Sequence, residues 1–214
     1  MKSYIFDFDG TIADSKQCSI LATKEAFQIL DLEIPSIEDI EYYMGIPIEQ
    51  SFKQMLSKQI DDIKFERLLD TFRQEYKRFE NDSLVLFPDM MNVLKELNCQ
   101  GKQCFVVSSK KTDVLLRNLQ TLKIAQFFKD YIGSDQVENY KPHPDGILKL
   151  VERYQIDIED SIMIGDAIFD IQMGKSAGCR TCAVTWGSHS EELLLTESPT
   201  FCIHKVSNLL SLNE

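Results

Sequence analysis

The chain has 214 residues, and 34 Asp and Glu against 23 Lys and Arg give a formal net charge of −11 at pH 7. Hydrophobic residues at 43% and charged residues at 27% are globular values, which excludes disordered and fibrous proteins. The length allows one large domain or two small ones with a buried core. Nucleic acids and anionic membranes are excluded as partners because they call for a basic face. A small anionic substrate bound by local lysines stays compatible with this charge.

The N-terminal residues and the cysteines indicate the cellular compartment. No stretch approaches the roughly 20 apolar residues of a membrane helix, and the start of the chain lacks the apolar segment of a signal peptide. The six cysteines are therefore expected to be reduced thiols. We expect a cytoplasmic protein, either a monomer or a homodimer.

Short β-like runs alternate with amphipathic helical stretches along most of the chain. The runs are rich in Val, Ile, Phe and Tyr and end at Gly, Ser or Asp. Strands are expected at residues 4–8, 103–107, 131–133, 162–164 and 181–185, and helices at 89–97, 113–122, 145–154 and 168–177. This repetition predicts an α/β fold with a Rossmann-like parallel sheet core, a three-layer α/β/α sandwich.

One region interrupts the alternation. From about residue 15 to residue 79 the apolar residues follow a helical period, and no convincing strand is present. We interpret this region as a helical-bundle cap domain at 15–85, inserted into a core of 1–14 and 86–214. The chain is expected to return to the core near residues 84–88, with Pro88 opening the next helix.

Two carboxylates close the first predicted strand. Asp7 and Asp9 are separated by one residue and are followed by Gly10, and period-two spacing places both side chains nominally on one side of the chain. Open α/β sheets bind ligands at this end of their strands. Because neighbouring carboxylates repel, the pair indicates a cation or a shared proton. An ordinary acidic turn contains the same residue types.

A second acidic pair follows the strand expected at 162–164. Asp166 and Asp170 are four residues apart and share a helix face if a helix begins there. Taken alone, they also fit a helix N-cap and a solvated carboxylate. Together with the first pair they offer the hard oxygen ligands that suit Mg²⁺.

Hydroxyl and ammonium groups lie between the two acidic pairs. Ser108 follows the strand expected at 103–107, where its hydroxyl and the next backbone N–H groups fit an anion or, alone, a helix N-cap. Lys141 precedes Pro142 and is held by a stiff backbone. Alone, it also fits a surface lysine.

The order of these residues resembles the four-motif signature of the haloacid-dehalogenase-like (HAD) hydrolase superfamily. Residues 7–15 look like motif one, Ser108 like motif two, Lys141 like motif three and residues 165–170 like motif four. The helical insertion after motif one resembles the C1 cap of the phosphoglycolate-phosphatase-like branch. Residues 44–48 look like the cap loop that faces the active site in this branch, although a plain helix–helix turn fits them equally well.

The resemblance implies a covalent mechanism with a metal ion. Asp7 would be the nucleophile that forms an aspartyl-phosphate, and Asp9 the general acid and then the base. Asp7, the backbone carbonyl of Asp9, and Asp166 would bind Mg²⁺. Asp170 would support that site directly or through water.

The same resemblance implies a set of substrate-binding residues. Ser108 and Lys141 would hold the phosphoryl oxygens. The expected set also includes Gly10 and Ser109 beside the motifs and Gly45 and Pro47 in the cap loop. Lys110 either adds positive potential near the site or is a solvated lysine.

We therefore expect a Mg²⁺-dependent phosphatase that acts on a small phosphorylated metabolite. A phosphoglycolate-like monoester, a nucleotide monophosphate and pyrophosphate all fit. A phosphomutase of the β-phosphoglucomutase type is an alternative, although residues 18–20 lack the basic histidine of such relatives. A dehalogenase is a second alternative, but relatives of that kind lack the second aspartate of motif one, and Asp9 is present here. A non-enzymatic binding protein on the same fold is the third alternative.

The remaining candidate ligands carry little weight. Cys179 and Cys182 have a redox or zinc spacing but no second such pair. His143, His189 and His204 are scattered and share no ligand spacing.

Overall fold

The structure, a computed structural model, describes residues 1–212. Six strands within this range form the central sheet: β1 (Ser3–Phe6), β4 (Gln103–Val107), β5 (Asp130–Ile132), β6 (Ser161–Gly165), β7 (Arg180–Val184) and β8 (Phe201–Ile203). All neighbouring pairs are parallel, in the order β5-β4-β1-β6-β7-β8. The parallel α/β core expected from the sequence is confirmed.

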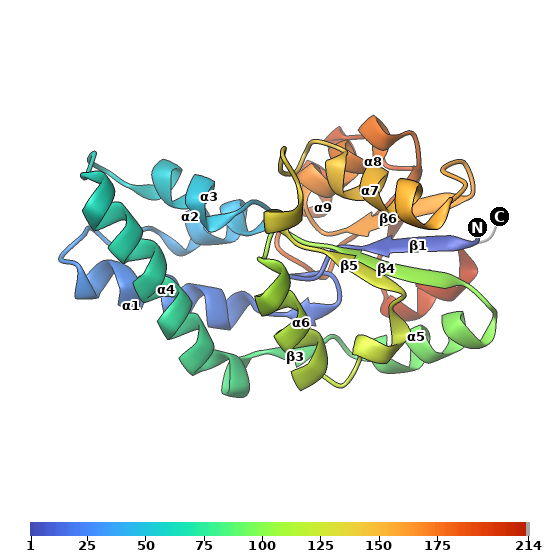
Figure 1. The fold of residues 1–214 in the computed structure, drawn as a ribbon, viewed down its shortest axis with the longest axis horizontal. Helices are drawn as coiled ribbons and strands as arrows, with labels where there is room; N and C mark the ends of the chain where they lie inside the picture. The colour runs from blue at the N-terminus through green and yellow to red at the C-terminus, as the bar shows by residue number, and fades with distance from the viewer. Residues whose placement is uncertain (213–214) are drawn as a thin grey trace.

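Helices cover both faces of this sheet. Their bounds are α5 (Met90–Cys99), α6 (Thr112–Thr121), α7 (Asp145–Tyr154), α8 (Ile168–Ala177) and α9 (Glu191–Thr196). Tyr4 and Phe6 pack in one cluster with Leu119 of α6, whereas Ile5 packs on the opposite face with Met173 of α8. Successive side chains of β1 thus enter two different cores, as the period of a strand requires. Figure 1 shows α7 and α8 on one side of the sheet and α5 on the other.

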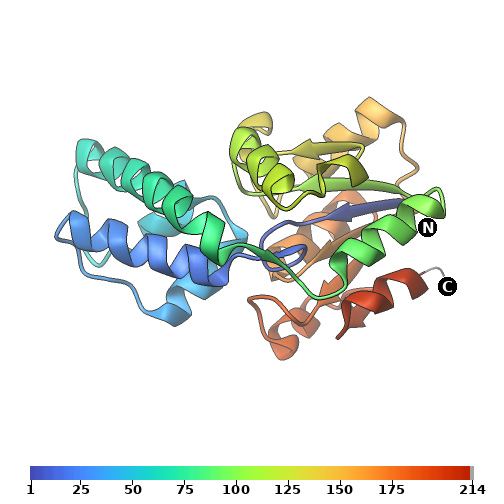
Figure 2. The ribbon, with the colours of Figure 1, turned by 90° about the horizontal axis from the view of Figure 1, so that it is seen from below.

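Four helices form a separate body beside the sheet (Figures 1 and 2). They are α1 (Lys16–Ile29), α2 (Ile37–Tyr42), α3 (Ile48–Met55) and α4 (Asp62–Ser83). Phe52 of α3 packs edge-on against Phe27 and Phe72, with ring centroids 5.3 and 5.1 Å away. These helices therefore have an apolar core of their own.

A short antiparallel ribbon connects the helical body to the sheet. It pairs β2 (Ala13–Asp14) with β3 (Val85–Leu86), where the chain leaves the core and returns to it. We propose this ribbon as the boundary between a cap of residues 15–85 and a core of residues 1–14 and 86–214. Every helix within residues 1–212 is too short or too polar to span a lipid bilayer.

Several elements differ from the sequence expectation. Strand β1 ends at Phe6 rather than at residue 8, because the backbone from Asp7 onward turns into the site. Helix α5 begins at Met90, preceded by Asp89 at a left-handed φ of 66°, so Pro88 does not open it. Strand β8 was not expected, since it has only three half-buried residues and no alternation to detect.

Candidate active site

The site lies at the carboxyl edge of the sheet, beside β1. The chain runs from β1 to β4 and β5 on one side and then crosses to β6 on the other, which makes β1 the point where the strand order reverses. Ligands of open α/β sheets bind in the crevice at such a point. Asp7 follows β1, Ser108 follows β4 and Asp166 follows β6. Strand order thus brings together residues that are far apart in the sequence.

A buried lysine joins two of the acidic side chains. Lys141 Nζ lies 2.5 Å from Asp7 Oδ1 and 2.8 Å from Asp170 Oδ1. The three residues are 6%, 5% and 1% exposed, respectively. Burial raises the pKa of Asp7 well above its ordinary value, although Lys141 opposes this shift. Burial alone lowers the pKa of Lys141, but Asp170 and Asp7 raise it above the usual range, so the ammonium stays charged.

The third acidic side chain is held by neutral donors. Thr11 Oγ1 donates to Asp166 Oδ1 at 3.0 Å, and the Ser188 backbone N–H donates to Oδ2 at 2.7 Å. Burial, and then the charge of Asp170, raise the pKa of Asp166 to about 7. Gly10 is required beside it: its φ is 75°, and a Cβ there would lie 2.1 Å from Asp166 Oδ2.

These three carboxylates fit a divalent cation. One ligand oxygen from each of Asp7, Asp166 and Asp170 lies within 4.8 Å of the others, and all three side chains are buried. Lys141 is the ammonium that contacts this group, so one positive charge faces three carboxylates. A bound Mg²⁺ would supply the missing charge, and oxygen ligands are the type it prefers. The residues present therefore fit the expected metal.

Asp9 is turned away from this cluster toward the cap. Its carboxylate accepts from Ser15 Oγ and lies 2.9 Å from Lys110 Nζ. Lys110 also donates to Tyr76 Oη of α4 at 2.9 Å. Burial lowers the pKa of Lys110, but Asp9 and Tyr76 raise it above the ordinary value. The Lys110 side chain is only 13% exposed and pairs with Asp9, which fits the interpretation of positive potential near the site better than that of a solvated lysine.

The serines after β4 contact the backbone and the cap. Ser108 Oγ accepts from the Lys110 N–H at 3.1 Å, and Ser109 Oγ donates to the carbonyl of Gly45 at 3.0 Å. Helix α6 is preceded by Lys111, so the N-cap interpretation of Ser108 is wrong. Pro47, Ser108, Ser109 and Lys141 line one small crevice. Four of the expected substrate-binding residues, from both core and cap, thus face a common space, whereas Gly10 and Gly45 do not line it.

Comparison with known proteins decides the family. The sequence model of haloacid dehalogenase-like hydrolases matches residues 4–184. The chain belongs to this family. A pyrophosphatase PpaX from Listeria monocytogenes serotype 4b is 30% identical over 210 residues, which cover 97% of this chain and 94% of that protein. The phosphatase-type hydrolase expected from the sequence is confirmed.

Two solved structures share the whole fold of this chain. A hydrolase of this family from Streptococcus pneumoniae is 27% identical, with a TM-score of 0.88 over 100% of this chain and 99% of that one. A predicted phosphoglycolate phosphatase from Haemophilus somnus 129pt is 22% identical, with a TM-score of 0.91 over 100% and 98%. The second likeness concerns the fold alone.

One residue to which the sequence analysis gave little weight connects the cap of this hydrolase to the catalytic edge. His189 is 4% exposed; its Nδ1 accepts from the Ile168 N–H at 3.2 Å. Its Nε2 therefore carries the proton and donates to the carbonyl of Tyr42 at 3.0 Å. The imidazole also stacks on the Tyr42 ring, with centroids 5.3 Å apart. No spacing signal pairs position 189 with position 42, so only the folded chain identifies this link.

The two cysteines with a metal-like spacing do not form a site. Cys179 packs in the cluster on the α7–α8 face of the sheet, and Cys182 packs in the cluster on the α5–α6 face. Their thiols therefore point to opposite sides, and burial raises the pKa of Cys179 to about 11. This placement agrees with the sequence analysis, which gave the pair little weight as a redox or zinc site.

The cap loop approaches the start of α8 so closely that only glycine fits. A Cβ on Gly45 would lie 2.9 Å from both Ala167 Cβ and Phe169 Cδ2. We expect Gly45→Ala to push the loop away from the catalytic edge and to lower kcat/KM by about tenfold, the equivalent of about 1.4 kcal/mol of overpacking. Steady-state phosphate release checks this. Gln50→Ala, an exposed position of α3, is the control, and equal kcat/KM in the two variants contradicts the prediction.

Proposed function

We propose that this hydrolase is a Mg²⁺-dependent phosphatase of small phosphorylated metabolites that works through an aspartyl-phosphate on Asp7. The observation that carries the proposal is the contact between Asp7 Oδ1 and Lys141 Nζ at 2.5 Å, inside a cluster of three buried carboxylates. A nucleophilic carboxylate must approach an anionic phosphate, and the ammonium offsets the repulsion between them.

The reaction divides into two displacements. Asp7 attacks phosphorus, the bond to the leaving oxygen breaks, and Asp9 donates a proton to that oxygen. Asp9 then takes a proton from water, which attacks the aspartyl-phosphate and releases inorganic phosphate with Asp7 regenerated. Lys141 and the Ser108 region bind the phosphoryl oxygens in both steps. The two-step route suits the hydrolysis of phosphate monoesters, which is among the slowest biological reactions without a catalyst.

The metal would be held by the three carboxylates of the acidic cluster and by one backbone carbonyl beside them. Asp7, Asp166 and the backbone carbonyl of Asp9 are the proposed ligands, with Asp170 binding directly or through water. When bound, Mg²⁺ supplies positive charge to the phosphoryl group and to its carboxylate neighbours. Thr11 and Ser188 orient Asp166 for this role through the two hydrogen bonds that they donate.

A phosphate-release assay with and without metal tests the proposal. The protein is incubated with a panel of small phosphate monoesters in Mg²⁺ and then in excess EDTA. We expect release in Mg²⁺, its loss in EDTA, and its return when Mg²⁺ is restored. Conversion of a hexose 1-phosphate to the 6-phosphate without net phosphate release would instead support a phosphomutase. Release that is indifferent to EDTA would overturn the metal requirement.

The raised pKa of Asp166 predicts how metal affinity depends on pH. With a pKa of about 7 in the metal-free protein, this carboxyl is mostly protonated below that pH and must lose its proton to bind a cation. We expect Mg²⁺ affinity to increase by about tenfold as the pH rises from about 6 to about 8. Calorimetric titrations of the metal at several pH values check this. A constant affinity across that range would contradict it.

Three further expectations stay predictions. They are the division into cap and core at the β2–β3 ribbon, the cytoplasmic location, and the monomeric or homodimeric state. Limited proteolysis at the ribbon and sedimentation of the full chain address the first and the last.

A further inference from the structure

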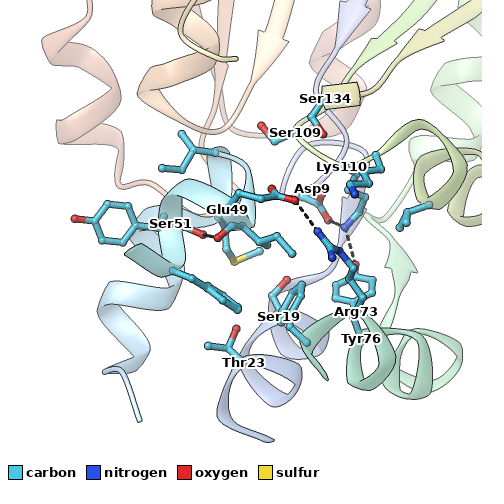
Figure 3. A pocket seen from close by; sticks show the side chains of 18 of the residues that line it. Asp9, Ser19, Thr23, Glu49, Ser51, Arg73, Tyr76, Ser109, Lys110 and Ser134 are labelled. Carbon is cyan, nitrogen blue, oxygen red and sulfur yellow. Dashed lines mark hydrogen bonds and ion pairs between the residues drawn. The ribbon is translucent and has the colours of Figure 1, made fainter. Parts of the chain in front are cut away.

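A cavity of about 120 Å³ lies between the cap and the catalytic edge (Figure 3). Asp9 lines it, whereas Asp7 does not. In the proposed mechanism Asp9 protonates the oxygen of the leaving group, so the leaving group occupies this cavity. Its chemistry can therefore be inferred from the cavity wall.

Apolar side chains of both the cap and the core make up much of that wall: Ile46, Ile48, Phe52, Met55, Phe72 and Val114. Apolar cavities of about 150 Å³ accept a benzene ring, so this cavity suits one compact ring or a branched chain of similar size. Burying such a group releases about 25 cal/mol for each Å² of apolar surface removed from water. The wall thus favours an apolar leaving group.

The charged residues on the cap side of the cavity are already paired. Arg73 Nη2 lies 2.7 Å from Glu49 Oε1, and its Nη1 lies 2.8 Å from Asp70 Oδ1. Figure 3 shows Glu49 and Arg73 pointing toward one another. Two carboxylates therefore cover one guanidinium. An anionic leaving group would meet Glu49 as well as Arg73.

The charged residues on the core side are paired in the same way. Lys110 contacts Asp9, and Arg117 binds Glu80 through two hydrogen bonds of 2.7 and 2.8 Å. Lys111, which also lines the cavity, is exposed to solvent. The partly buried cations of the wall, Arg73, Lys110 and Arg117, thus leave little charge for a second anion, whose burial is costly without a partner.

We propose that the leaving group is an uncharged alcohol or phenol with a compact apolar body about the size of one ring. The inference rests on the proposed phosphatase function and narrows its substrate class. Phosphoglycolate and pyrophosphate fit this wall poorly, because their leaving groups carry a carboxylate or a second phosphate. A monoester of a neutral, ring-sized alcohol meets the apolar wall and leaves the ion pairs of Glu49 and Arg73 intact.

A pair of non-hydrolysable ligands tests the wall directly. Benzylphosphonate and 4-carboxybenzylphosphonate differ by one remote carboxylate and are titrated calorimetrically into the full chain in Mg²⁺. We expect the carboxylate to weaken binding by tenfold or more. Equal or tighter binding of 4-carboxybenzylphosphonate would overturn the inference.

A substitution in the cavity wall tests whether the charge of Glu49 causes the weaker binding of the carboxylate ligand. Glu49→Gln removes one of the two carboxylates on Arg73, so the affinity for 4-carboxybenzylphosphonate should rise at least threefold while that for benzylphosphonate stays unchanged. Glu66→Gln, at an exposed position of α4 outside the cavity wall, is the matched control. If Glu49→Gln changes both affinities equally, the charge of this wall does not select the leaving group.

Hydrolysis assays distinguish a failure of this inference from a failure of the proposed function. Phosphate release is measured from benzyl phosphate, 4-carboxybenzyl phosphate and methyl phosphate, whose leaving oxygens are all of the alcohol type. We expect the highest kcat/KM for benzyl phosphate. Release from methyl phosphate with no preference for benzyl phosphate overturns the inference alone. Phosphonate binding in the expected order without release from any ester overturns the proposed function.

Discussion

Asp7→Asn should reduce phosphate release by at least about 10³-fold, because an amide cannot form the acyl-phosphate that a carboxylate forms. The fold should survive the change. Asn has nearly the shape of Asp, and burial raises the pKa of Asp7 well above its ordinary value. Lys141 keeps Asp170 as a charged partner in this variant, so the metal-free protein should lose little stability. Loss of turnover with an unchanged unfolding temperature is the expected pair of results.

A chemical readout strengthens this experiment. Acid quenching of the wild-type protein during turnover should trap one phosphoryl group on the peptide that contains Asp7, and mass spectrometry of the digest detects it. Asp113→Asn, an exposed carboxylate in the first turn of α6, is the matched control and should match the wild type. Phosphate release by Asp7→Asn at the wild-type rate would show that Asp7 is not the nucleophile.

The catalytic edge was predictable because the strands that build it have strong local patterns. The run of Cys, Phe and Val that forms β4 was expected at 103–107 and lies at Gln103–Val107. Once strands of this kind pair in parallel, the residues after them meet at one edge, whatever their distance in the sequence. Ser108 and Asp166 therefore came to the same site as Asp7 from strand order alone.

The contacts between cap and core were not predictable in the same way. Lys110 reaches Tyr76 across 34 positions, and His189 reaches Tyr42 across 147. Such pairs depend on how two bodies dock, which no periodicity of either body encodes. The spacing of Asp7 and Asp9 misleads for a related reason. Strand β1 ends before them, so Asp7 contacts Lys141 whereas Asp9 contacts Lys110 and faces the cap.

The contrast between the catalytic edge and the contacts of the cap separates two kinds of information in the sequence. In the proposed function the core residues specify the phosphoryl chemistry, and they follow from motif and strand order. In the proposed choice of leaving group, Glu49, Arg73 and the apolar wall decide, and their residue types are common in any helical bundle. A sequence therefore identifies the reaction class of such a chain more readily than its substrate.

Lys141→Met should have the second large effect, on both catalysis and stability. The ammonium contacts Asp7 and Asp170 at 2.5 and 2.8 Å and is 6% exposed. Removing a charged donor from the phosphoryl site should lower kcat/KM by about 10²- to 10³-fold. Removing one partner of a buried ion pair costs about 3–5 kcal/mol. The metal-free variant should therefore unfold at a clearly lower temperature than the wild type.

Magnesium provides the internal check on this variant. Without Lys141, the cation becomes the main positive charge facing Asp7, Asp166 and Asp170, so added Mg²⁺ should raise the unfolding temperature more in Lys141→Met than in the wild type. Lys95→Met, at an exposed position of α5, is the matched control and should change neither property. Thermal unfolding with and without Mg²⁺, together with phosphate release, measures both effects. A folded Lys141→Met variant with the kcat/KM of the wild type would contradict the role of this lysine, because no other ammonium among residues 1–212 contacts Asp7 within 4.0 Å.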